Sequence, residues 1–161
     1  MSDAAPKPAP VRIEIETPAD AGAVEALVLA AFGPGRFAKT AERLREKAGI
    51  AVGFAARHEG RIIGSVRLWK IRIGETSAVF LGPIAVADEH RKGGVGAELM
   101  QACLARASAD RCGVLLIGDT DYFGRFGFVP ATQVRLPGPV DPRRVLWRGE
   151  ASPEGLAQPV P

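Results

Sequence analysis

Cysteine is scarce in this chain of 161 residues, which contains Cys103 and Cys112 and no others. Two cysteines are too few for a disulfide scaffold, and they lack the second pair that a tetrahedral metal site needs. Cys103 falls within an apolar-periodic segment and Cys112 near its end, so we interpret both as buried structural thiols rather than nucleophiles. We therefore expect no metal site and a reducing compartment.

Long hydrophobic runs are also missing. No stretch approaches the roughly 18 consecutive apolar residues that a membrane span requires. The first ten residues are rich in Ala and Pro and have no apolar core of the kind that a signal peptide carries. The sequence thus predicts a disordered leader over residues 1–10 and a cytoplasmic protein that has no membrane partner.

The excess of charge of one sign is small, with 21 Lys and Arg residues against 18 Asp and Glu residues, a net charge of +3. The basic residues are dispersed rather than gathered into one block, so nucleic acid is not required as a partner. A ligand that carries several phosphates would suit a locally basic site equally well.

The sequence does have the composition of a globular protein, with 47% apolar residues and a length that is usual for one domain. We predict a single domain over residues 11–148 and a loose tail over residues 149–161. No internal repeat is visible.

Apolar periodicity and turn residues predict a mixed, mostly antiparallel sheet with helices on its faces, an α/β (α+β) fold. The order begins with a strand at 11–16, a helix that runs to residue 32 and a short helix at 40–48. The remaining elements expected are strands at 51–57, 62–73, 78–86, 114–117 and 145–147, a helix at 97–110 and a short helix capped within 118–121.

Residues 81–96 run from a strand through a glycine-rich turn into a helix. Backbone amides at the start of a helix have no internal partner, and the helix dipole favours negative charge there, so such a turn can bind a diphosphate. Glycines let the backbone approach phosphates closely, and Arg91 and Lys92 can add countercharge. On spacing alone, an ordinary tight connection explains the glycines equally well.

Two better-known phosphate loops do not fit this segment. A P-loop needs Gly-Lys-Ser/Thr after its glycines, whereas Ala97 and Glu98 follow here. The dinucleotide-binding fingerprint expects its turn in an early βαβ unit, whereas this turn follows several predicted antiparallel strands.

Arg91, Gly94 and Gly96 match the pattern Arg/Gln-x-x-Gly-x-Gly/Ala. With this motif the sequence resembles the GNAT acetyltransferase superfamily, and residues 118–128 resemble its YhbS-like branch. The similarity extends over about residues 11–147. It implies a GNAT-like sheet and an acetyl-CoA-dependent N-acetyltransferase in which a primary amine attacks the thioester directly in a ternary complex, without a covalent intermediate.

The resemblance also implies where the cosubstrate acetyl-CoA binds. The backbone at the strand end would pair with pantetheine, and amides of the turn would hold the pyrophosphate, with Arg91 beside them. The expected binding residues are Ile84, Ala85, Val86, Arg91, Lys92, Gly93, Gly94, Val95 and Gly96.

The catalytic groups depart from the family pattern. Many members carry a tyrosine four residues before the Gly of a Gly-Phe pair, where it protonates the departing thiolate, and counting back from Gly127 gives Phe123. Tyr122 is adjacent and is our candidate acid. Asp119 and Asp121 are candidate bases, although Asp119 suits a helix cap equally well.

A non-catalytic acyl-CoA-binding or sensory module is the alternative function, because Phe123 cannot donate a proton. The acceptor, a small molecule or a protein with an amine, is not specified by the sequence, and neither is the acyl chain length. Family members often pair through sheet edges, so a homodimer is possible through the strand at 145–147.

Overall fold

The computed structural model describes residues 9–35 and 39–161. Most of the predicted leader, residues 1–8, lies outside the described residues. The helices and strands, with 3-10 helices marked η, are β1 (Arg12–Ile15), η1 (Pro18–Asp20), α1 (Ala21–Phe32), α2 (Thr40–Arg45), β2 (Ile50–His58), β3 (Arg61–Ile73), β4 (Thr76–Leu81), β5 (Ala85–Val86), η3 (Asp88–Gly93), α3 (Val95–Ala109), β6 (Gly113–Ile117), α4 (Thr120–Phe123), η4 (Gly124–Phe126), β7 (Val129–Pro130), β8 (Val134–Arg135), η5 (Pro142–Arg144), β9 (Val145–Arg148) and β10 (Gly155–Pro159).

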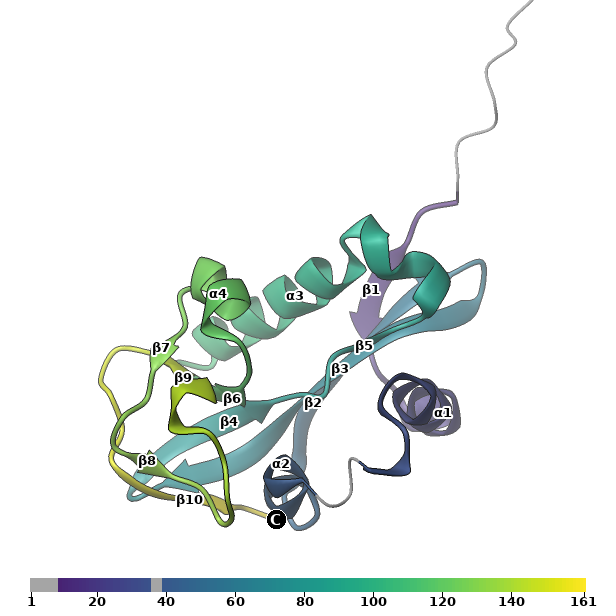
Figure 1. Cartoon of the computed structure of the whole chain (residues 1–161). Helices are drawn as coiled ribbons and strands as arrows, with labels where there is room; N and C mark the ends of the chain where they lie inside the picture. Colours follow the sequence, from purple (N-terminus) through teal and green to yellow (C-terminus); the bar gives the residue numbers. More distant parts are fainter. Residues whose placement is uncertain (1–8, 36–38) are drawn as a thin grey trace, which may run out of the picture.

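These strands form one sheet in the order β1-β2-β3-β4-β6-β9-β7, with β5 and β10 also paired to β3 (Figure 1). Within the described chain, only the pairs β4–β6 and β8–β10 are parallel. The predicted mixed, mostly antiparallel sheet is therefore confirmed. No helix in the described ranges is long and apolar enough to cross a membrane.

Side chains alternate along β3 and so bury two different faces. Val66 and Leu68 belong to the cluster that includes α3, whereas Ser65, Arg67 and Trp69 face a cavity that α1 and α2 also line. Helices thus cover both faces of the sheet, as predicted.

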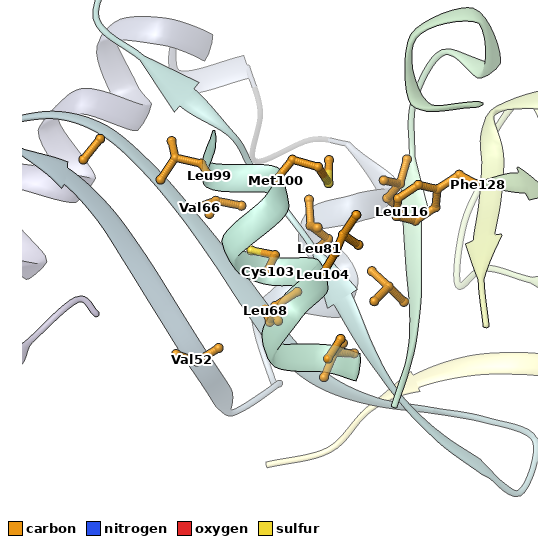
Figure 2. Packing of buried hydrophobic residues seen from close by; sticks show 14 of the residues in the cluster. Val52, Val66, Leu68, Leu81, Leu99, Met100, Cys103, Leu104, Leu116 and Phe128 are labelled. Carbon is orange, nitrogen blue, oxygen red and sulfur yellow. The ribbon is translucent and has the colours of Figure 1, made fainter. Parts of the chain in front are cut away.

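The main core lies between α3 and the sheet. Figure 2 shows Leu99, Met100 and Cys103 of α3 pointing toward strand residues such as Val66 and Leu68. Cys103 is fully buried, and this burial raises the pKa of its thiol to about 12. Its interpretation as a structural thiol is therefore confirmed.

An acidic cap joins the start of the first helical segment to the sheet. The Asp20 carboxylate accepts hydrogen bonds from the Thr17 backbone nitrogen at 2.8 Å and from the Thr17 hydroxyl at 3.1 Å, and it forms an ion pair with Arg57 at 2.6 Å. These contacts, with the Arg57 hydrogen bond as the largest cause, lower the pKa of Asp20 from its ordinary 3.8 to about 2.

Replacing this carboxylate is expected to make the free energy of unfolding depend less on pH in the acidic range. Because folding lowers the Asp20 pKa, the ionised group stabilises the fold above its unfolded value of 3.8, and this contribution is lost as pH falls through about 2. Asp20→Asn should lower the urea midpoint at pH 7, and its difference from wild type should shrink toward pH 2. Asp110→Asn, at an exposed ion pair, is the control, and an Asp20→Asn difference that stays constant with pH would contradict the prediction.

The single strand predicted over residues 78–86 is wrong, because it is divided into β4 and β5. Gly82 has φ +133° and Pro83 has no amide hydrogen to donate, so a regular ladder cannot continue through them. The Gly82 nitrogen instead donates to the Arg67 oxygen at 3.0 Å, and the Trp69 indole donates to the Gly82 oxygen at 2.6 Å. The strand then resumes as β5, which pairs with β3.

The loose tail predicted over residues 149–161 is also wrong, because it contains β10. Ala157 is fully buried and pairs with Ile73, and the Val160 nitrogen donates to the Lys70 oxygen at 2.9 Å.

Strand β9 lies between β6 and β7, so both of its edges are occupied. The expected pairing between subunits through residues 145–147 is therefore not available. Helix α3 begins two residues earlier than expected, at Val95, and α2 ends at Arg45 rather than at residue 48.

Candidate functional site

The candidate site lies where two parallel strands separate. Strands β4 and β6 pair as far as Phe80 and Leu115, and the register ends there. Beyond this point lies a cavity of about 510 Å³. One wall is the segment from Leu81 to Ile84, and the opposite wall comes from the end of β6 and from α4. The interruption of the strand at Gly82 and Pro83 therefore helps to form the opening.

Positive charge predominates among the ionisable residues that line this cavity. Lys39, Arg45 and Arg144 contribute three cations, of which Arg45 is ion-paired with Glu42 at 3.3 Å, and Asp119 contributes one carboxylate. A cavity with this balance favours an anionic ligand. Lys39 and Arg45 lie at the two ends of α2, far in the chain from Arg144, and only the fold brings them to one cavity.

The glycine-rich turn lies between β5 and α3. Residues 88–93 form η3, and Gly94 then adopts the left-handed conformation with φ +80°. A Cβ added at Gly93 or Gly94 would meet no atom within 4 Å, so the backbone there is open to an incoming group. The turn is followed by a helix of 15 residues, whose first amides have no intrahelical partner. The residues present therefore fit a bound diphosphate.

Arg91 is held beside the end of β5. Its guanidinium forms an ion pair with Asp88 at 3.0 Å, and its Nε donates to the Val86 oxygen at 3.4 Å. The side chain is still 55% exposed, and Lys92 is exposed as well. Two cationic side chains thus lie at the surface of the turn, which increases its preference for anions.

Tyr122 and Phe123 both line the cavity, but they differ in how they are held. Tyr122 is 38% exposed, and its ring meets Phe123 edge-on at 4.9 Å. Phe123 packs against the main core, and its ring lies so close to Gly118 that a Cβ there would clash with it. Of the two rings, Tyr122 is the more accessible.

Asp119 lines the same cavity and caps α4. Its Oδ1 accepts a hydrogen bond from the Asp121 nitrogen at 3.0 Å. Asp121 is exposed and is not among the residues that line the cavity. The structure thus brings Ile84, Asp119 and Tyr122 together and leaves Asp121 outside.

In the described ranges, no group of three or more His, Cys, Asp or Glu side chains is placed to hold a metal ion.

Comparisons with known proteins agree with this geometry. Residues 23–128 match the acetyltransferase (GNAT) family. The chain is 29% identical over 144 residues to the uncharacterized N-acetyltransferase YhbS of Escherichia coli, with 87% of this chain and 82% of that protein covered.

Solved structures give the same result. Escherichia coli YhbS in complex with CoA superposes with a TM-score of 0.82 at 24% identity, over 99% of this chain and 94% of that one. A GNAT acetyltransferase from Brucella melitensis in complex with acetyl-CoA gives a TM-score of 0.64 at 26% identity, over 84% and 94%. Because the family match covers more than half of the chain and the sheet agrees with it, this chain belongs to the GNAT family of N-acetyltransferases.

Proposed function

We propose that this chain uses acetyl-CoA to acetylate a primary amine by direct attack in a ternary complex. The observation that carries the proposal is the cavity between β4 and β6. It is lined by cationic side chains and by Ile84, which directly precedes β5 and the open turn before α3. The similar proteins from Escherichia coli and Brucella melitensis were solved with CoA and acetyl-CoA, which supports the choice of cosubstrate.

Residues of β5 and of the turn would hold the cosubstrate. Strand β5 pairs with β3 through Val86 and Ala85, and its other edge has no partner strand in the described chain. Backbone groups from Ile84 to Val86 are therefore available to pantetheine. The amides of residues 92–96, with the guanidinium of Arg91, would bind the pyrophosphate.

The chain has three tasks in the reaction once acetyl-CoA supplies the acetyl group. A bound amine must lose a proton, which Asp119 or a chain of water molecules would accept, because an alkylamine with a pKa near 10.4 is mostly charged at neutral pH. A strand amide near Ile84 stabilises the oxyanion that develops on the carbonyl. The Tyr122 hydroxyl donates a proton to the departing thiolate, and Asp119 positions Tyr122 by capping α4.

Calorimetric titration with acetyl-CoA, followed by a thiol-release assay over a panel of amines, tests this function. Binding together with amine-dependent thiol release is the expected result. Binding without release would favour the non-catalytic module, and the absence of binding would overturn the proposal.

Tyr122→Phe is expected to lower kcat about tenfold, because water can partly replace the lost hydroxyl as proton donor. The dissociation constant of acetyl-CoA should stay within about twofold of wild type, because binding depends on the turn. Adding Phe123→Tyr to this variant should not restore activity, since that ring packs against Gly118. Unchanged kcat in Tyr122→Phe, or rescue by Phe123→Tyr, would exclude Tyr122 as the acid.

A further inference from the structure

Strand β1 forms an open edge of the sheet. In the described part of the chain it pairs with β2 alone, in a continuous register over Arg12–Ile15. Figure 1 shows β1 on the opposite side of the sheet from β7. The backbone groups on the outer side of β1 are therefore available to a further strand.

Alternation along β1 determines which residues form this outer edge. The Glu16 nitrogen donates to the Gly53 oxygen at 2.7 Å, so even-numbered residues of this segment turn their backbone groups toward β2. Val11, Ile13 and Ile15 turn theirs outward. None of the three is a proline, so each outward position offers both a donor and an acceptor.

The side chains of β1 also divide into two rows. Ile13 packs against the main core, and Ile15 of the same row is 57% exposed. In the other row, Glu14 accepts hydrogen bonds from the Arg12 Nε at 3.1 Å and from the Arg57 Nε at 2.9 Å. The Arg12 side chain is nevertheless 71% exposed. The edge thus presents aliphatic groups on one face and a charge of each sign on the other.

A second copy of β1 fits this edge in one antiparallel register. With a two-fold axis at Ile13, that residue faces its own copy and Val11 faces Ile15 of the partner subunit, so every outward residue meets an outward residue. The same register places Arg12 opposite Glu14 of the partner subunit, at a non-hydrogen-bonded pair, where side chains approach most closely. An axis at Arg12 or at Glu14 would instead place like charges opposite each other. The charges therefore select the register centred on Ile13.

We propose that this protein forms a two-fold dimer in which β1 pairs with β1 of a second copy, centred on Ile13. The sheet then continues from one subunit into the other. Ile15 is covered by Val11 of the partner subunit, and symmetry forms the pair between Arg12 and Glu14 twice. The occupant of the edge is a second copy because the charge pattern of β1 is complementary to itself.

The dependence of mass on protein concentration tests the dimer. In sedimentation at low salt, the wild-type mass should rise toward twice that of one chain. Arg12→Glu places like charges opposite each other at two symmetric positions, so it should weaken association about tenfold. Circular dichroism should show that this variant is folded.

Arg143→Glu is the matched control for charge. Arg143 is exposed and also pairs with an acidic residue two positions away, Asp141, at 2.9 Å. This variant should associate as wild type. A wild-type chain that stays monomeric at millimolar concentration would overturn the inference, and so would an Arg12→Glu variant that associates as tightly as Arg143→Glu.

Disulfide cross-linking tests the register. Cys112→Ser first removes the partly exposed native thiol. On that chain, Ile13→Cys brings two thiols to the axis, where opposite Cα atoms are about 5.5 Å apart, within the range of a disulfide. The control is Ile15→Cys, at a more exposed position whose two copies would lie about 14 Å apart along the strands.

Oxidised glutathione should therefore convert the Ile13→Cys chain into a covalent dimer and leave the Ile15→Cys chain mainly monomeric. Random collisions would instead favour the more exposed thiol. Equal yields from the two chains, or a higher yield from Ile15→Cys, would overturn the pairing centred on Ile13.

Discussion

Gly94→Glu is expected to weaken acetyl-CoA binding about 100-fold, which corresponds to roughly 2.7 kcal/mol. The new carboxylate would project from a position that now faces open space, at the positive end of α3, where it would repel the pyrophosphate. Gly94 also has φ +80°, a conformation that costs a residue with a side chain about 1–2 kcal/mol. Calorimetric titration with acetyl-CoA measures the loss.

Gly60→Glu separates the backbone effect from the charge at the turn. Gly60 lies in the hairpin between β2 and β3, has φ +78° and also faces open space. Both variants should therefore lose similar stability to urea, and only Gly94→Glu should lose binding. Equal acetyl-CoA affinities of the two variants would show that the pyrophosphate does not bind at this turn.

Trp147→Ala is expected to lower the free energy of unfolding by about 4 kcal/mol, a typical cost of deleting a large buried aromatic side chain. Trp147 is 3% exposed and lies in the core cluster with Phe80 and Leu115. Its ring lies directly over Gly113, where any Cβ would clash with it. The indole thus occupies the space that a side chain at position 113 would need. Urea unfolding followed by circular dichroism measures the change.

Trp147→Phe tests which part of the side chain contributes. The indole nitrogen is buried and has no hydrogen-bond partner among the described residues, so phenylalanine removes an unsatisfied group while it keeps an aromatic ring. It should recover more than half of the stability that alanine loses. If Trp147→Ala unfolds no more easily than Trp69→Ala, at the half-buried tryptophan of β3, the packing argument is wrong.

Local patterns predicted the elements that depend on neighbours in sequence. Helix α3 has apolar residues one turn apart, and the hairpin at Glu59 and Gly60 contains the two positive φ angles that its turn requires. The order of strand, glycine-rich turn and helix is local too, which is why the motif at Arg91 could be placed before the fold was known.

Features that depend on distant contacts could not be predicted in this way. The division between β4 and β5 is stabilised by the Trp69 indole of β3, which donates a hydrogen bond to the Gly82 oxygen between these two strands. The cavity lined by α1, α2 and β3 requires α2 to pack near β3, and a helix of six residues gives little sign of which side chains will face inward. Strand β10 has few apolar residues and is ordered by its pairing with β3, so its composition resembled that of a tail.

Strand β10 also affects how the chain is made in the cell. Synthesis proceeds from the N-terminus, so β3 is complete well before residues 155–159 exist. Until then, the part of β3 that contains Ile71 and Ile73 can pair with β4 on one side and has no partner on the other. Such open apolar edges recruit other chains. We therefore expect nascent and prematurely terminated chains, rather than the finished protein, to be the species that aggregates and depends on chaperones.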